Sequence, residues 1–281
     1  MRRELEPWLA GREVARAELL APPGPKYANL ERAAGQRVLA VRRRGKFIIA
    51  PLSGGDELVV HLGMTGSLAP QEPPDHVRVR LHLLGEGPRT LYFRDPRRFG
   101  RFLVVRAGDY AALPTLSALG PEPFDPDLTA ELFARNLGRS RAPVKAYLLS
   151  QRPVAGVGNI YADEALWRAG INPATPAAAL TVAQAGALLA ALRDVLAESI
   201  AANGTTLRDY RRVGGEAGAF YEKLAVYGKG GEPCPRCGEP LARSVLGGRG
   251  TVHCPTCQPA PRRRRAAPRP AARREGARRG R

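Results

Sequence analysis

The chain has 281 residues, a formal net charge of +18 and 44% hydrophobic residues, which is enough to bury the core of two ordinary domains or one large one. It has no uncharged apolar run of the roughly 18 residues that a membrane span needs, and no apolar stretch typical of a signal peptide follows its basic start. We therefore expect a cytosolic protein. The excess of positive charge indicates a polyanionic partner.

Half of that net charge lies at the end of the chain. The segment from Pro259 to Arg281 contains ten Arg and one Glu and no large apolar side chain. This composition predicts a disordered basic tail. Binding to a membrane surface would explain the tail as well as binding to nucleic acid would. The remaining body is basic too, and a membrane surface explains that part less well.

The first residues, MRRELEPWLAGREV, predict a helix with Leu5, Trp8 and Leu9 on one apolar face and Gly11 as its C-terminal stop. No Ser, Thr, Asp or Asn precedes it as a cap, and Arg2 lies at the end of the helix dipole where acidic residues are preferred. One hypothesis is that residues upstream are missing. A frayed but true N-terminus is the alternative.

The first third of the chain predicts β structure. Six segments alternate or run apolar between Gly, Pro and Asp turns: REVARAEL, QRVLAVRRRGKFIIAPL, DELVVHLGM, HVRVRLHLL, RTLYFRD and RFLVVRAG. Strands this close in sequence leave little room for crossover helices, so we expect an antiparallel sandwich or barrel. The segment from Leu119 to Leu128 holds three prolines and ends the pattern, which predicts a domain boundary there.

The part beyond this boundary predicts helices. Asn159 is a candidate N-cap and Gly170 a stop for IYADEALWRAG. In the next helix Thr181 and Gln184 predict a capping box, and Asn203-Gly204 predicts its end. The segment VGGEAGAF is rich in Gly and predicts a mobile loop.

Four cysteines, spaced C-x2-C-x16-C-x2-C, predict a tetrahedral zinc site: Cys234, Cys237, Cys254 and Cys257. Two disulfides or a redox pair are alternatives, although a cytosolic setting argues against stable disulfides. His253 could replace a ligand, but we expect it on a strand face. Zinc ribbons are usually structural, yet the hairpin between the two pairs carries Arg249 near its tip, which a purely structural clip does not require.

Several longer motifs resemble those of the formamidopyrimidine-DNA glycosylase (Fpg/Nei) family, in the family's order, over roughly residues 1 to 258: HLGMTGSL, DPRRFG, GVGNIYADEALWRAGINP, VYGKGGEPCPRCG and GGRGTVHCPTCQ. The resemblance implies an α+β multidomain protein. It implies an N-terminal β-sandwich at 1–120, a helix-two-turn-helix DNA-binding domain at 121–230 and a zinc finger at 231–258, ahead of the tail at 259–281. DNA would lie between the domains.

The resemblance also assigns roles to residues. A damaged base must be flipped out of the duplex, and Met64, Arg97 and Phe99 match the residues that fill the space it leaves. A thioether and an aromatic ring suit insertion between bases, and a guanidinium can bond to the orphaned base. Without the motifs, Met64 and Phe99 would be interpreted as core residues.

Further positions match residues of the family that face DNA: His61, His76, Arg141, Lys145, Asn159 and Arg249. Asn159 lies at a helix start, where free backbone amides attract a phosphate. The family often has another histidine where this chain has Pro74, so the role of His76 is open. Lys46 matches a lysine that assists catalysis, with an ordinary solvated strand lysine as the alternative. Arg249 matches a residue that binds phosphates flanking the lesion and helps the last elimination.

In the family the nucleophile is an N-terminal proline followed by a glutamate, which attacks C1′ and leads through a Schiff base to β- and δ-elimination. An N-terminal amine suits this step because its pKa is about 7.7–8.0. The stretch RRELEPWLAG resembles the part directly after that motif. We expect that the start has been assigned too far downstream; a truly truncated, non-catalytic protein is the alternative.

The expected function is a glycosylase and abasic-site lyase of base-excision DNA repair that removes oxidised purines from duplex DNA. It would use one structural Zn²⁺ and act as a monomer in a bacterial-type cytoplasm, at the nucleoid. Three alternatives stay open: a non-catalytic DNA-binding protein, an endonuclease VIII-like enzyme for oxidised pyrimidines, and a zinc-ribbon RNA-binding factor.

Overall fold

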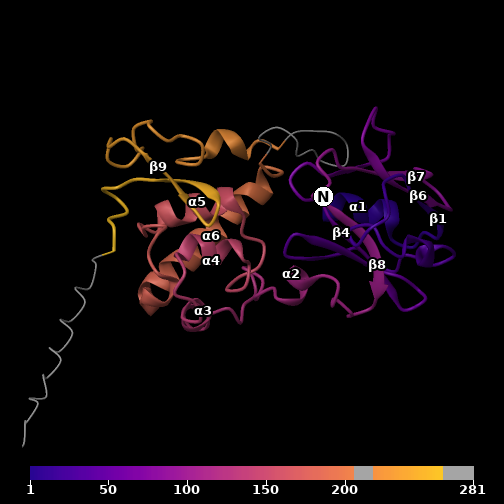
Figure 1. The fold of residues 1–281 in the computed structure, drawn as a ribbon, viewed down its shortest axis with the longest axis horizontal. Coiled ribbons are helices and arrows are strands. Elements are labelled where there is room, and N and C mark those ends of the chain that lie inside the picture. Colours follow the sequence, from indigo (N-terminus) through magenta and orange to yellow (C-terminus); the bar gives the residue numbers. More distant parts are fainter. Residues whose placement is uncertain (206–217, 262–281) are drawn as a thin grey trace, which may run out of the picture.

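A computed structural model describes residues 1–205 and 218–261 of the chain. It has a β-rich N-terminal domain, a helical domain and a small C-terminal hairpin domain that packs on the helices (Figure 1). Most of the segment predicted as a mobile loop, and the basic tail from residue 262, lie outside the described residues. Within the described part, none of the helices has the length and apolarity that crossing a membrane requires.

The N-terminal domain is a sandwich of two four-stranded antiparallel sheets, ordered β1-β6-β7-β5 and β2-β3-β4-β8. The strands are β1 (Val14–Leu19), β2 (Arg42–Arg44), β3 (Phe47–Pro51), β4 (Asp56–His61), β5 (Ser67–Ala69), β6 (Val77–Leu83), β7 (Thr90–Arg94) and β8 (Arg101–Arg106). The predicted sandwich is therefore confirmed. The pattern missed β5 because its three residues are too few to show an alternation.

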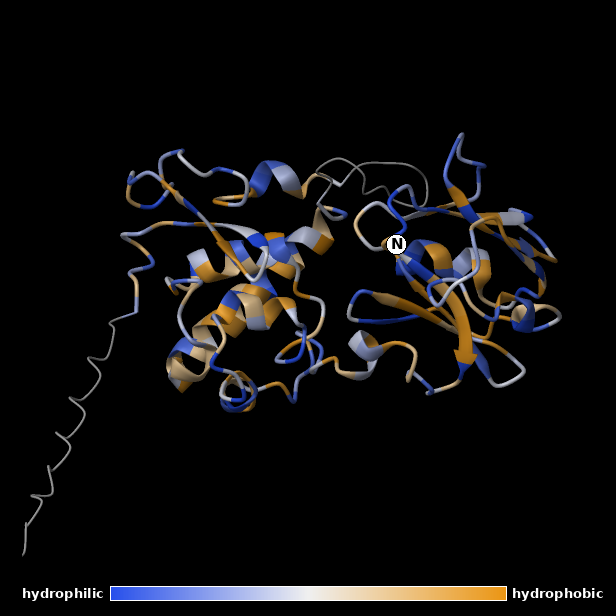
Figure 2. Cartoon of the chain, in the orientation of Figure 1, coloured by the Kyte–Doolittle hydropathy of each residue, from blue (hydrophilic) through white to orange (hydrophobic). Residues whose placement is uncertain are grey.

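The two sheets differ in burial, and the sequence shows why. In the first sheet β6 alternates between buried and half-buried residues, since only one face meets the core. The second sheet is covered on both faces, by the first sheet and by α2 (Pro114–Ser117) with the segment around it. Its strand β3 is accordingly apolar, and β8 is apolar between its terminal residues Arg101 and Arg106, as the hydrophobic colouring of β8 shows (Figure 2).

The N-terminal helix α1 (Arg2–Leu9) buries Leu5 and Leu9 in the sandwich core. Met1 precedes it without a side-chain cap, and Gly11 follows it at φ 81°, so both the missing cap and the glycine stop are confirmed. A 3-10 turn, η1 (Leu30–Ala33), closes one side of the same core.

The helical domain encloses its own core. Its elements are α3 (Ala130–Leu137), α4 (Val144–Leu149), α5 (Asn159–Arg168), η2 (Ala177–Ala179), α6 (Val182–Ala201) and η3 (Phe220–Lys223). The long helix α6 packs against α3 and α5. Its capping box of Thr181 and Gln184 is confirmed, and Asn203 and Gly204, both at positive φ, end it as predicted.

The last domain is a hairpin of β9 (Ala242–Leu246) and β10 (Arg249–His253). Its two-residue turn is Gly247-Gly248, and both residues have positive φ (57° and 71°), which suits glycine and the twist of the strands. Arg249 is the first residue after the turn, so it lies at the tip of the hairpin as predicted.

Candidate functional site

Lys46 lies where the sandwich meets the helical domain. It occupies the two-residue turn between β2 and β3, and its Nζ donates a hydrogen bond to the carbonyl of Val157, 3.1 Å away in the loop before α5. Its side chain remains accessible to solvent, although protein atoms crowd the ammonium group. This desolvation, together with the positive charge of Arg249, lowers the pKa of Lys46 to about 8. An ordinary solvated strand lysine would not have such a pKa.

Asn159 is the first residue of α5, and its side-chain Nδ2 donates to the carbonyl of Gly250 at 3.1 Å. The N-cap of α5 is Gly158, so the prediction that Asn159 is the cap is wrong. Gly158 adopts the extended conformation that a cap requires, and no side chain caps the helix. Oδ1 of Asn159 is buried and has no hydrogen-bond partner among residues 1–205 and 218–261.

Lys145 is fully buried, which corrects the expectation that its side chain faces DNA. Its Nζ lies 2.7 Å from Oδ1 of Asp163 on α5 and donates to the carbonyl of Gly250 and to Oγ1 of Thr251, each at 2.8 Å. The neighbouring strand also bonds to the pair, because the backbone N–H of Val252 donates to Asp163. Lys145 thus holds the strand that begins with Arg249.

Asp163 is a buried partner of Lys145 and Val252 that the sequence analysis did not single out. Burial raises its pKa to about 6, against the opposing effect of Lys145. The sequence did offer a signal for it. Asp163 follows Asn159 by four residues, and residues so spaced on a helix lie on the same face, so Asp163 could have been expected beside Asn159.

Met64 and Phe99 are exposed on two loops of the sandwich, at 54% and 52%. This exposure rules out the alternative that they belong to the core. The guanidinium of Arg97 lies over the ring of Phe99, 5.5 Å from its centroid. The three residues proposed to fill the space of a flipped base therefore stay at the surface, with Arg97 and Phe99 in contact.

The two loops that carry these residues are tied together at Gly63 and Asp95. A Cβ on Gly63 would lie 2.7 Å from the carbonyl carbon of Phe99, so only glycine allows the loops to approach this closely. Asp95 is fully buried and accepts hydrogen bonds from the backbone N–H of Gly100 at 2.7 Å and from Oγ1 of Thr65 at 3.1 Å. Asp95 belongs to the motif DPRRFG, but the sequence alone did not show what it does.

His61, at the end of β4, is neutral. Burial, and after it the charges of Lys46 and Arg101, lower its pKa to about 4. Its Nδ1 accepts a hydrogen bond from the backbone N–H of Gly63 at 3.1 Å, which places the ring proton on Nε2. His61 is thus close enough to Lys46 to be affected by its charge, and it contacts the loop of Met64 through Gly63.

The remaining two predicted DNA contacts are at the surface. His76 is exposed at φ 57°, and its Nδ1 lies 3.0 Å from Oδ2 of Asp75. Arg141 is exposed in the loop between α3 and α4, and its side chain has no ion pair or hydrogen bond among the described residues.

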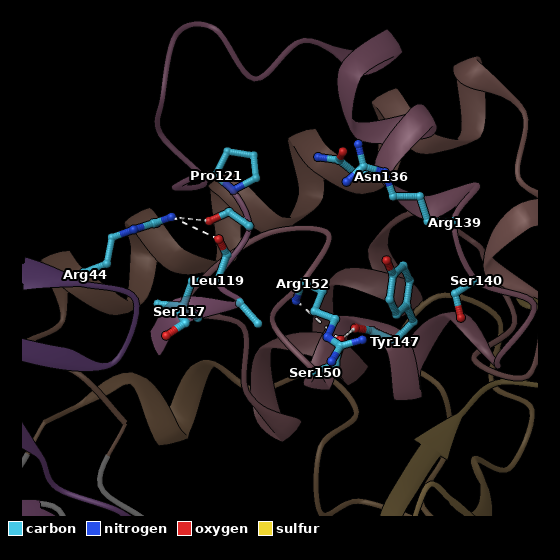
Figure 3. A pocket seen from close by; sticks show the side chains of 12 residues that line it. Arg44, Ser117, Leu119, Pro121, Asn136, Arg139, Ser140, Tyr147, Ser150 and Arg152 are labelled. Atoms are coloured by element: carbon cyan, nitrogen blue, oxygen red, sulfur yellow. Dashed lines mark hydrogen bonds between the residues drawn. The ribbon is translucent and has the colours of Figure 1, made fainter. Parts of the chain in front are cut away.

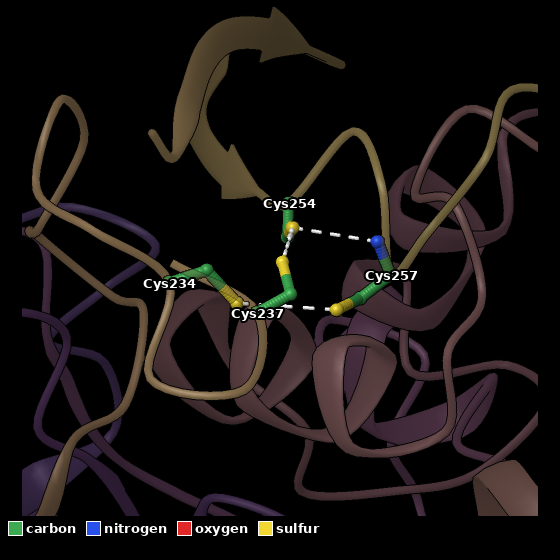
Figure 4. Close-up of side chains that lie close together, drawn as sticks. All are labelled: Cys234, Cys237, Cys254 and Cys257. Carbon is green, nitrogen blue, oxygen red and sulfur yellow. Dashed lines mark hydrogen bonds between the residues drawn. The ribbon is translucent and has the colours of Figure 1, made fainter. Parts of the chain in front are cut away.

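The four cysteines converge as predicted, between the hairpin and the C-terminal end of α5 (Figure 4). Their sulfur atoms all lie within 4.8 Å of one another, with 3.5 Å between Cys237 and Cys254 and 4.0 Å between Cys234 and Cys257. Tetrahedral zinc with Zn–S bonds of about 2.3 Å requires such spacings. No disulfide joins any two of these four cysteines, so the arrangement favours the metal site over the two disulfides. The metal-compatible cluster does not include His253, which lies on β10 as expected.

A cavity of about 670 Å³ lies elsewhere, between the linker near Gly120 and the helices α3 and α4 (Figure 3). Arg44 reaches across the domain junction and donates to the carbonyls of Leu119 and Gly120, at 3.2 and 2.6 Å. The cavity contains none of the residues predicted to bind DNA. The two hydrogen bonds of Arg44 join the sandwich to the linker.

Three family models match the chain. They are described as the formamidopyrimidine-DNA glycosylase N-terminal domain (residues 1–102), the H2TH domain of the same glycosylase (119–211) and a zinc finger found in FPG and IleRS (231–260). A formamidopyrimidine-DNA glycosylase of Thermus thermophilus is 51% identical over 259 residues, which cover 92% of this chain and 95% of the relative.

Solved structures give the same result. The crystal structure of the MutM (Fpg) protein of Thermus thermophilus has a TM-score of 0.85 and 50% identity and covers 92% of this chain and 95% of its own. A structure of MutM in complex with DNA containing carbocyclic 8-oxo-G has a TM-score of 0.80 and 32% identity, with coverages of 92% and 97%.

Proposed function

The chain belongs to the formamidopyrimidine-DNA glycosylase family, and on that premise we propose that it removes oxidised purines from duplex DNA in base-excision repair. It is a DNA glycosylase that also cleaves at the abasic site, and its partner is lesion-containing DNA. The observation that supports this most directly is the convergence of Lys46, Asn159 and Arg249 from three separate domains.

This convergence suits a flipped nucleotide. Arg249 and the free amides at the start of α5 would bind phosphates flanking the lesion. Lys46, with its pKa of about 8, is neutral in part of the population near pH 7 and can exchange a proton with the sugar or the departing base. His61 is neutral and can donate from Nε2.

Lesion choice follows from the loops of Met64 and Phe99. We propose that both side chains enter the stack while Arg97 bonds to the orphaned base, the arrangement that the resemblance assigns to the purine-specific branch. Exposed apolar side chains on loops held by Asp95 are already placed for insertion, so little ordering is required when DNA binds.

The test is excision from matched duplexes that contain 8-oxoguanine, a formamidopyrimidine or an oxidised pyrimidine, using protein made from its own gene. We expect cleavage of both purine lesions and a covalent adduct trapped by borohydride, whose peptide mapping identifies the attacking amine. Preferential cleavage of the oxidised pyrimidine would favour the endonuclease VIII-like alternative. Salt-sensitive binding with no adduct would favour a non-catalytic DNA-binding protein.

We further propose that the protein acts as a monomer at the nucleoid, in the cytoplasm. Light scattering of the complex with a short lesion duplex tests it, since a mass of two chains per duplex would contradict it.

A further inference from the structure

Helix α5 contacts the finger at each of its ends. Its first residue is Asn159, and its last two residues, Trp167 and Arg168, lie beside the cysteine cluster. The first cysteine pair, Cys234 to Cys237, contacts this C-terminal end directly. Trp167 packs on the small core of the finger, which includes Cys234 and Cys254.

Trp167 donates a hydrogen bond to a metal-binding sulfur. Its indole Nε1 lies 3.4 Å from Sγ of Cys234. Indole N–H is a donor only, and a thiolate is a far better acceptor than a thiol, so the bond is suited to the metal-bound form of the cysteine. Four thiolates around Zn²⁺ carry a net charge of −2, and N–H donors around them offset part of it.

Arg236, which lies between Cys234 and Cys237 in sequence, covers the same indole. Its guanidinium is 4.6 Å from the ring centroid, and one of its N–H groups donates to the carbonyl of Arg168 at 3.2 Å. The positive charge of Arg236 is attracted to the face of the indole, and it is also attracted to the negative end of the helix dipole at the C-terminus of α5. The indole of Trp167 therefore contacts the first cysteine pair in two ways, through the guanidinium of Arg236 over its ring and through Sγ of Cys234 at its N–H.

The second cysteine pair is attached to the loop that follows α5. Gln258 donates to the carbonyl of Ile171 and accepts from the backbone N–H of Cys254, and Asn172 donates to the carbonyl of Gln258. These three distances are 2.8 to 2.9 Å. Because these contacts are independent of Trp167, loss of the indole N–H leaves the finger docked and changes the surroundings of one sulfur.

We propose that Trp167 is an outer-sphere positioning residue of the zinc site, whose indole N–H holds the Cys234 thiolate and retains the metal. The family's cysteines bind the ion, and this helix residue controls how firmly they do so. Outer-sphere partners of metal ligands typically change metal affinity by about 10- to 100-fold when they are replaced.

The first test uses the zinc-loaded full-length chain and its variants W167F and W8F. The chain has two tryptophans, Trp8 and Trp167. The W167F change keeps an aromatic ring for Arg236 and removes the N–H together with part of the indole's bulk. We expect W167F to transfer zinc to a colorimetric chelator roughly 10-fold faster or more. W8F, in which the change lies against the sandwich core, should match the parent. Equal transfer rates for W167F and the parent would overturn the proposal.

The second test does not alter Trp167 and holds even if W167F folds poorly. In W8F the only remaining tryptophan is Trp167, so its fluorescence reports on the surroundings of Cys234. We expect chelation of the zinc to change that fluorescence and re-addition of Zn²⁺ to restore it. A signal that is the same with and without the metal would contradict the proposed bond.

Discussion

Lys145 and Asp163 form an ion pair that is closed to solvent, with 2.7 Å between Nζ and Oδ1 and exposures of 0% and 1%. The pair joins α4 to α5, and Lys145 also bonds to Gly250 and Thr251. A lysine that the sequence placed among the DNA contacts is thus bonded inside the protein, to Asp163 and to the strand that begins with Arg249.

Replacing Lys145 by Met should destabilise the protein by about 3–5 kcal/mol, because the carboxylate of Asp163 would stay buried without its partner. Urea unfolding measures this loss. The double variant with Asp163→Leu should recover much of it, since both charges are then removed. Arg141→Ala is the control and should change stability little, since Arg141 is exposed. A K145M variant as stable as R141A would disprove the structural role.

The pKa of Lys46 should be measurable near 8 and should rise when Arg249 is replaced by Ala, because one of the two causes of its lowering is the charge of Arg249. The neutral amine then forms only at higher pH, so the rising limb of the pH–rate profile should move in the same direction. NMR of ¹³C-methylated lysines reports the titration, with K46R identifying the signal. An unchanged titration in R249A would mean that burial alone lowers the pKa.

Met64→Ala and Phe99→Ala should slow excision while leaving stability nearly unchanged, because both side chains are about half exposed in the free protein. Phe93→Ala is the matched control. Phe93 is 0% exposed, and its loss should cost about 3–5 kcal/mol. Thermal unfolding and single-turnover excision are measured on the same samples. Large destabilisation by M64A or F99A would mean that these side chains support the fold.

Replacing Cys237 or Cys254 by Ser should release zinc and abolish DNA binding, because the hairpin with Arg249 depends on the metal for its structure. Metal content and duplex affinity are the two measurements. A folded, zinc-free variant that still binds lesion DNA normally would show that the finger is dispensable.

Deleting residues 259–281 should weaken non-specific DNA binding and reduce its salt dependence, because the segment carries half of the net positive charge. Binding titrations at several salt concentrations measure the slope. Lesion preference should stay the same, since the residues proposed to read the lesion lie in the sandwich. A changed preference would assign the tail a role in recognition.

Local patterns were sufficient for much of this protein. The alternating strands, the capping box of Thr181 and Gln184 and the paired cysteines are each defined within a few neighbouring residues, and the structure has all of them. The cap at Gly158 was not predicted, because a glycine in extended conformation caps through its backbone and leaves no side-chain sign.

Burial and long-range partners could not be derived in this way. The chain shows that Lys145, Asp95 and Trp167 are present, but not which residues they meet. Their partners Asp163, Thr65 and Cys234 lie on other elements, distant in sequence. Such contacts form only when separate elements pack together. Packing depends on the whole fold, and it makes the two lysines different. Lys46 lies at the domain junction with a lowered pKa, whereas Lys145 is buried in an ion pair with Asp163.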